Sequence, residues 1–306
     1  MRTSTQSDSK PGSELGALLR HWRDARRRSQ FDLSIDTGVS QRHISFIESG
    51  RSTPGRQTLM DIAQALDIPL RDRNTLLLAA GFAPLYSEGG WNTQEMQGIN
   101  RALERMLRQH EPFPAVVMDR YWNIFMANDA APRFFNSFNP EATHKAPRNM
   151  LHLMFDPARI RPYIANWESV AKSLFERVYR ESVGRMIDEK TKALLAELLA
   201  YPDVQAGWKA PEATGRPSTE RASGGRLPAG RTAAGWSPSD AAASRLPIIP
   251  IGFVKDGQVL NYFSLVATVG TPQTVAAQEL RLECMFPADE ATEARHLEIM
   301  SKAPAA

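Results

Sequence analysis

Apolar side chains recur at helical spacing along the first 80 residues. Leu15, Leu19 and Trp22 lie three or four positions apart, so they would share one face of a helix. The same spacing continues downstream and predicts five short helices, over residues 14–25, 30–37, 40–50, 56–68 and 69–81.

Residues that favour helix ends separate these segments. Gly38 would terminate the second helix, and Ser40 would cap the amino end of the third. Pro69 stands near the start of the fifth helix and Gly81 just past its end, which are the positions that each residue favours.

The pattern changes after Gly89–Gly90. A further helix is predicted over 93–110, two short strands over 114–119 and 122–128, a helix over 129–138, and a largely helical stretch from 148 to 200. From residue 246 onward the pattern predicts strands, over 248–255, 258–269 and 279–286. Asp256–Gly257 separates the first two of these strands, as in a hairpin. In the last strand Leu282 and Cys284 alternate with Arg281 and Glu283, which is typical of a half-buried strand.

Residues 206–245 differ from the rest of the chain. Ala, Gly, Pro, Ser, Thr and Arg supply 33 of these 40 positions. Because so few large apolar groups cannot offset the entropy of ordering, we expect a flexible insertion that is dispensable for folding.

The composition bounds the class of protein. The 306 residues are enough for two domains, and no apolar run approaches the roughly 18 residues of a membrane span. The first 14 residues lack the apolar core of a secretory signal, so we expect a cytoplasmic protein. Cys284 is the only cysteine, which excludes disulfides within the chain.

Basic residues are concentrated in the helical segment. Residues 1–87 hold 12 Lys and Arg against 9 Asp and Glu, whereas the remainder holds 25 of each. The excess centres on "RHWRDARRR", with Arg20, Arg23 and Arg26–Arg28. Such a local basic face could neutralise phosphates, although a basic helix end can also simply complement its own dipole.

The stretch "SQFDLSIDTGVSQRHISFIESGRSTPGRQTLMDIAQAL" resembles the Cro/lambda-repressor-like (Xre-type) helix-turn-helix domain, and the resemblance spans residues 14–80. It implies that the third helix enters the major groove of double-stranded DNA. Gln41 matches the family's base-reading glutamine and Gln30 its phosphate-contacting residue. Arg23 and Glu48 match a structural ion pair. The full set of expected DNA-binding residues is Gln30, Ser40, Gln41, Arg42, His43, Phe46 and Arg51. For Phe46, contact with a thymine methyl and burial against the first helix remain open alternatives.

The segments "HEPFPAVVMDRYWNIFMAN" and "GTPQTVAAQELRLECMFPADEAT" resemble the MmyB-like transcription regulators, in which a PAS-like α+β domain follows the helix-turn-helix. Residues 1–12 are expected to form a disordered lead. The two resemblances imply a DNA-binding domain over 13–87 and a PAS-like domain over 88–300, which the insertion over 206–245 interrupts. The MmyB-like resemblance also implies a small ligand, which an apolar lining would make acyl-like. Because one helix-turn-helix domain reads only about half of a site, we expect a homodimer. The expected ligand-binding residues are Met118, Met126, Asn128, Phe134 and Met154, although each of them could serve only the core or a local turn.

No motif for catalysis is visible. The six histidines show no metal-ligand spacing, and neither a phosphate-binding glycine loop nor a nucleophile elbow occurs. We therefore expect no catalytic residues, no metal and no cofactor. Two alternatives stay open: a sensor that holds a flavin or haem, and a regulator whose second domain binds a protein partner.

Overall fold

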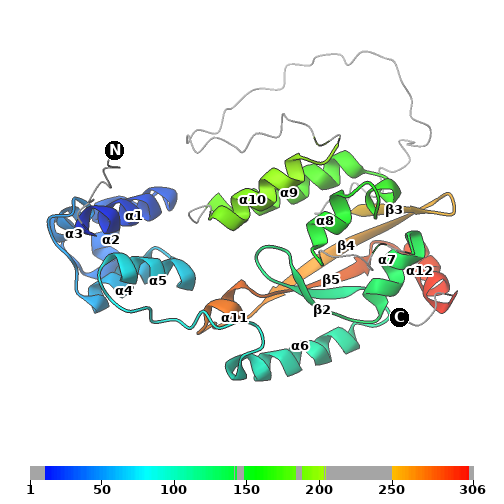
Figure 1. Ribbon diagram of the computed structural model, residues 1–306, viewed down its shortest axis with the longest axis horizontal. Coiled ribbons are helices and arrows are strands. Elements are labelled where there is room, and N and C mark those ends of the chain that lie inside the picture. Colours follow the sequence, from blue (N-terminus) through cyan, green and yellow to red (C-terminus); the bar gives the residue numbers. More distant parts are fainter. Residues whose placement is uncertain are drawn as a thin grey trace, which may run out of the picture.

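Figure 1 shows the computed structural model, which describes residues 11–140, 142, 148–183, 188–202, 204 and 250–302. A domain of five helices is followed by a domain in which helices surround an antiparallel sheet, as the predicted fold class requires. The insertion predicted over 206–245 lies outside the described residues. Within the described part of the chain, no helix is long and apolar enough to cross a membrane.

The five helices of the first domain begin and end close to the predicted positions. They are α1 (Pro11–Ala25), α2 (Gln30–Thr37), α3 (Gln41–Glu48), α4 (Arg56–Ala65) and α5 (Leu70–Ala79). Gly38 ends α2 with a φ of 69°, and the Ser40 hydroxyl accepts a hydrogen bond from the backbone N–H of His43 at the start of α3. The predicted stripe of Leu15, Leu19 and Trp22 is buried in the core of this domain.

The sheet of the second domain has five strands in the order β2-β1-β5-β4-β3, and every neighbouring pair is antiparallel. The strands are β1 (Ala115–Met118), β2 (Ile124–Ala127), β3 (Ile251–Lys255), β4 (Gln258–Thr268) and β5 (Arg281–Pro287). Asp256 and Gly257 form the predicted hairpin between β3 and β4, with φ angles of 50° and 75°. Both angles lie in the left-handed region that such tight hairpins require.

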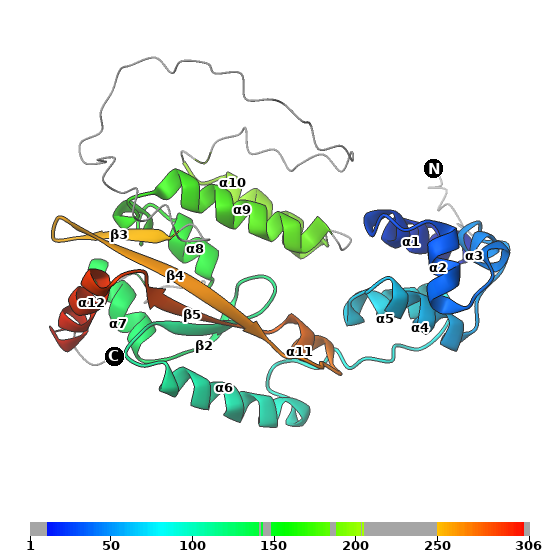
Figure 2. The same ribbon diagram turned by 180° about the vertical axis from the view of Figure 1, so that it is seen from behind.

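Helices cover both faces of the sheet (Figures 1 and 2). On one face, α6 (Gln97–Gln109), which follows the short helix η1 (Gln94–Met96), packs against Val117 and Leu282. On the other face, Val116 and Phe253 belong to a larger core. The helical elements that contribute to this core are α7 (Ala130–Phe138), α8 (Met150–Phe155), η2 (Arg161–Tyr163), α9 (Trp167–Val183), α10 (Glu189–Leu199) and α12 (Glu290–Lys302).

Two helices were not predicted from the sequence. The five-residue helix α11 (Val275–Glu279) connects β4 to β5, and α12 follows β5. Asp289 immediately precedes α12, and its carboxylate accepts a hydrogen bond from the backbone N–H of Thr292. Asp289 therefore helps to begin a helix.

Candidate DNA-binding surface and interior cavities

The first turn of α3 projects from the five-helix domain. Ser40, Gln41 and Arg42 are exposed and His43 is half-buried, whereas Ile44 and Ile47 on the opposite side of the helix are buried. The apolar pair fixes α3 in the core, so the polar first turn faces solvent. This is the geometry that a recognition helix needs in order to reach base edges.

Phe46 is contacted by two arginines. The guanidinium carbons of Arg42 and Arg51 lie 5.3 and 5.9 Å from the centre of its ring. The ring is half-buried. Phe46 thus links the first turn of α3 to Arg51 beyond its end, and these two cations share one aromatic surface.

Glu48 joins three elements of the domain, and only 2% of its side chain is exposed. Arg23 on α1 donates from Nε to Oε1 at 2.7 Å and from Nη2 to Oε2 at 3.1 Å, which confirms the predicted ion pair. Gln30 on α2 donates from Nε2 to Oε2 at 2.9 Å. Burial alone would raise the pKa of Glu48, but the hydrogen bonds and charge of Arg23 outweigh it and hold the pKa below its usual range.

Most arginines of the basic cluster at the end of α1 form hydrogen bonds or ion pairs within the domain. Arg26 donates to the backbone carbonyls of Leu66 and Asp67, and Arg28 pairs with Asp36. These contacts fasten the end of α1 to neighbouring helices. Of the clustered arginines, Arg20 and Arg27 are exposed.

A small apolar cavity lies between the sheet and α8–α9, with a volume of about 40 Å³. We call it the tryptophan cavity, because Trp122 belongs to its lining. Trp122 is 1% exposed, and its indole N–H has no hydrogen-bond partner among the described residues. The other lining residues include Phe135, Met150, Met154, Leu174 and Met285.

The turn between β1 and β2 directs this indole inward. Trp122 has a φ of 67°, a conformation that is uncommon for a residue with a side chain. Asp119 holds the turn, because its carboxylate accepts hydrogen bonds from the backbone N–H groups of Tyr121 and Asn123, at 2.8 and 2.9 Å. The conformation of Trp122 is therefore imposed by its neighbours.

A second cavity, of about 230 Å³, lies between β2, α7 and α8, and we call it the β2 cavity. Val116 and Phe135 line both cavities and separate them. Arg148, Asn149 and Arg159 add polar groups to the β2 cavity, whose remaining lining is mostly apolar.

Two of the five residues expected to bind ligand line a cavity. Met154 lines the tryptophan cavity and Met126 the β2 cavity. Met118, Asn128 and Phe134 line neither of these cavities, and they are buried in the fold. Their apolar or PAS-like sequence context could not distinguish a cavity wall from a filled core.

The side-chain amide of Asn128 forms its hydrogen bonds with the backbone of the protein. Its Oδ1 accepts from the backbone N–H groups of Ala115 and Ala131, and its Nδ2 donates to the carbonyls of Phe113 and Leu107. The side chain therefore ties α6, β1 and α7 together. Only the bond from Ala131 is the local turn that the sequence left open for Asn128, since the other three partners are 13, 15 and 21 residues away.

Comparisons with known proteins agree with this division into two domains. Residues 14–76 match a helix-turn-helix domain, and residues 99–224 match the MmyB-like transcription regulator ligand binding domain. The chain combines a helix-turn-helix domain with an MmyB-like ligand-binding domain. An HTH-type transcriptional regulator of Sinorhizobium fredii is 46% identical over 52 residues, which are 17% of this chain. The chain covers 26% of that protein, about a quarter of its length.

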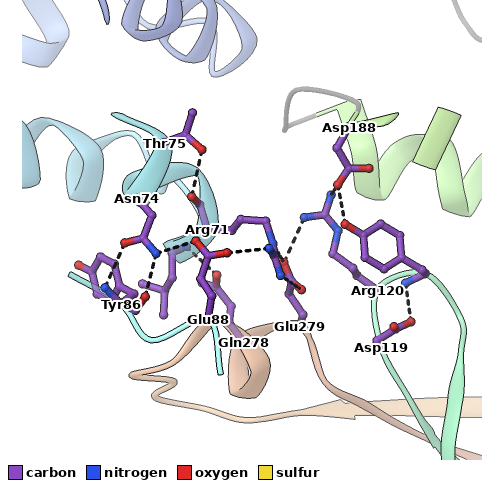
Figure 3. A network of polar contacts seen from close by, with 12 residues as sticks. Arg71, Asn74, Thr75, Tyr86, Glu88, Asp119, Arg120, Asp188, Gln278 and Glu279 are labelled. Atoms are coloured by element: carbon purple, nitrogen blue, oxygen red, sulfur yellow. Dashed lines mark hydrogen bonds and ion pairs between the residues drawn. The ribbon is translucent and has the colours of Figure 1, made fainter. Parts of the chain in front are cut away.

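The helix-turn-helix domain and the MmyB-like domain meet through residues that sequence reasoning missed. Arg71 on α5 forms a two-pronged ion pair with Glu279 on α11, at 2.8 and 3.0 Å (Figure 3). Arg120, in the turn between β1 and β2, lies 3.1 Å from the same carboxylate. The partners are far apart in the sequence, so no local pattern could have paired them.

Proposed function

We propose that this protein is a ligand-responsive transcription regulator, which binds a double-stranded DNA operator through α3 and a small molecule inside its MmyB-like domain. The two matched domains and the exposed first turn of α3 support the DNA-binding half. The sheet order β2-β1-β5-β4-β3 supports the PAS-like assignment of the second domain.

We assign the reading of bases to Gln41 and Arg42 and the contact with phosphate to Gln30 and Arg51. Gln41 is exposed on the first turn, where a glutamine amide can form two hydrogen bonds with adenine. Gln30 is half-buried and fixed through Glu48, which suits a residue that sets the position of the helix on the DNA backbone. Ser40, His43 and Phe46 complete the proposed surface.

The proposed binding of a ligand rests on the buried indole N–H of Trp122, which has no hydrogen-bond partner among the described residues. Leaving a buried donor unpaired costs about 1–3 kcal/mol, which an acceptor atom of a ligand would recover. The tryptophan cavity is mostly apolar, with Ser264 and Glu283 as further polar residues of its lining, and the β2 cavity lies directly behind Phe135 and Val116. Rotation of Phe135 would connect the two spaces, so we propose an elongated acyl-like ligand with one polar end.

Direct binding measurements test this assignment. We expect a straight-chain fatty acid to bind the purified protein in calorimetry and to appear in native mass spectra after lipid extraction. Met154→Trp would fill the tryptophan cavity and abolish binding, and Leu153→Trp would do the same in the β2 cavity, which Leu153 lines from α8. Met106→Trp is the matched control, because Met106 is exposed on α6. Equal binding by Met154→Trp and Met106→Trp would remove the proposed site.

We also propose that the protein acts as a homodimer. One helix-turn-helix domain reads about half of a two-fold operator, so two copies suit a complete site. The full chain should bind two correctly spaced half-sites much more tightly than one, whereas residues 1–87 alone should bind weakly and without a ligand response. Sedimentation of the full chain as a monomer on a two-half-site operator would contradict this proposal.

A further inference from the structure

The amino end of α5 is completed by the MmyB-like domain. Pro69 precedes α5 and supplies no side-chain cap, but Gln278 on α11 accepts a hydrogen bond from the backbone N–H of Leu70 at 2.7 Å. The next residue of α5, Arg71, holds Glu279 on α11, and Glu88 lies 3.0 Å from the same guanidinium. The first turn of α5 is therefore fastened to α11 by one cap and one ion pair (Figure 3).

Arg120 extends this contact into the MmyB-like domain. Its side chain is only 6% exposed, and it lies between two carboxylates, with Nη1 3.1 Å from Glu279 and Nη2 2.9 Å from Asp188. Asp188 caps α10 by accepting from the backbone N–H of Thr191 at 2.8 Å, and it also accepts from the Tyr121 hydroxyl at 2.6 Å. A buried arginine needs its anionic partners. Arg120 can therefore keep both contacts only while α10 and α11 keep their positions relative to each other.

The same short turn reaches the interior of the domain. Arg120 and Trp122 are two residues apart, and Asp119 fixes the backbone between them. Arg120 points to the interdomain contact (Figure 3), whereas Trp122 lines the tryptophan cavity. A displacement of the indole would therefore be transmitted through a rigid turn to the guanidinium of Arg120.

We propose that the β1–β2 turn couples the tryptophan cavity to the DNA-binding domain, with Trp122 as its inner end and Arg120 as a clamp on Glu279 and Asp188. A ligand that moves Trp122 would loosen or tighten the clamp, and with it the first turn of α5. The role of a ligand as the natural signal rests on the proposed function. The physical connection between the tryptophan cavity and the first turn of α5 does not. Coupling of this kind requires two positions of one element that both sites bias, and we assign that role to the turn, which would move as a rigid unit.

Hydrogen exchange of the full chain, without ligand or DNA, tests the clamp. Asp188→Asn keeps a good helix cap but removes the charge that Arg120 holds. We expect it to raise the exchange rate of the Leu70 amide, which Gln278 binds, by at least about threefold, although Asp188 lies in the other domain. In an Arg120→Gln background the same substitution should have no further effect. Glu189→Gln is the matched control, because it removes an adjacent carboxylate that is 89% exposed and pairs with Lys192.

A second pair of variants tests the inner end of the turn. Trp122→Leu should raise exchange at the first turn of α5, whereas Phe155→Leu, at an equally buried position away from the turn, should not. Because coupling is reciprocal, Arg71→Gln should raise the exchange rate of the Thr191 amide in the MmyB-like domain. This test does not depend on whether the Arg120 variant folds. Unchanged exchange at α5 in both Asp188→Asn and Trp122→Leu would overturn the proposal. If these variants behave as expected but the protein binds no fatty acid, the proposed coupling stands and only the proposed ligand is refuted.

Discussion

The side-chain amide of Gln30 on α2 donates a hydrogen bond to Glu48 on α3, from Nε2 to Oε2 at 2.9 Å. Arg23 holds the same carboxylate from the other side. The residue proposed to contact phosphate is thus positioned by the helix proposed to read bases. One amide hydrogen and the amide oxygen of Gln30 are not needed for this bond and could face the DNA.

Gln30→Ala should weaken DNA binding to the same extent on every sequence. The substitution removes a backbone contact, which fixes position but carries no sequence information. We expect the salt dependence of binding to change little, because the lost group is neutral. Titrations of a cognate and a scrambled operator, at two salt concentrations, measure both effects. A changed base preference would contradict the assignment.

Gln41→Ala should instead relax the preference at a single base pair. Loss of one bidentate contact costs about 1–3 kcal/mol on the cognate site and less on others. Gln57→Ala is the matched control, since Gln57 is exposed on α4. A library of operators with single substitutions measures the profile. If affinity fell equally for all sequences, Gln41 would be a phosphate contact.

Removing either partner of the Arg23–Glu48 pair should destabilise the first domain more than removing both. A buried charge that loses its partner costs about 3–5 kcal/mol, whereas an apolar pair of similar volume restores part of that loss. Urea unfolding of residues 1–87 as wild type, Arg23→Met, Glu48→Leu and the double variant measures the coupling. Additive effects would show that the two side chains do not depend on each other.

Gly16→Ala should destabilise the same domain because α1 passes very close to the end of α3. A Cβ atom at Gly16 would lie 2.5 Å from the carbonyl oxygen of Glu48, and the backbone would have to move. Overpacking of this kind costs about 1–3 kcal/mol. In contrast, Gly98→Ala on α6 meets nothing within 4 Å and should be neutral or stabilising. Thermal unfolding should therefore show a lower melting temperature for Gly16→Ala and an equal or higher one for Gly98→Ala. Equal shifts would show that α1 can adjust at no cost.

Local signals were sufficient to predict most elements of this fold. Gly38, Ser40 and the Asp256–Gly257 turn act through their own backbone, so the sequence alone locates the ends of α2, α3, β3 and β4. By contrast, α12 buries Thr292 and His296 beside Ile299, so polar residues on its inner face hide the apolar stripe. The helix α11 is too short to show a periodic pattern.

The interior of the second domain was harder to predict for a different reason. Methionine and phenylalanine have the same hydropathy whether they fill a core or border a space. Phe134 packs against Phe138, Phe253 and Tyr262, whereas its neighbour Phe135 separates two cavities. That distinction depends on how distant segments pack, as does the contact between Arg71 and Glu279.

The contact between the domains should weaken in acid. Burial alone would raise the pKa of Glu279, but hydrogen bonds and charge from Arg71 and the charge of Arg120 outweigh it, so the folded-state pKa lies below the ordinary value. A carboxylate with a lowered pKa contributes stability that is complete above its unfolded-state pKa and is lost as the pH falls through the folded-state pKa. Wild type should therefore exceed Glu279→Gln in melting temperature at pH 7, and the difference should be smaller at pH 3, which lies below the ordinary pKa of 4.5. Glu189→Gln, at an exposed position, should match wild type at both pH values. A difference between wild type and Glu279→Gln that stays constant over this range would mean that the charge of Glu279 does not hold the two domains together.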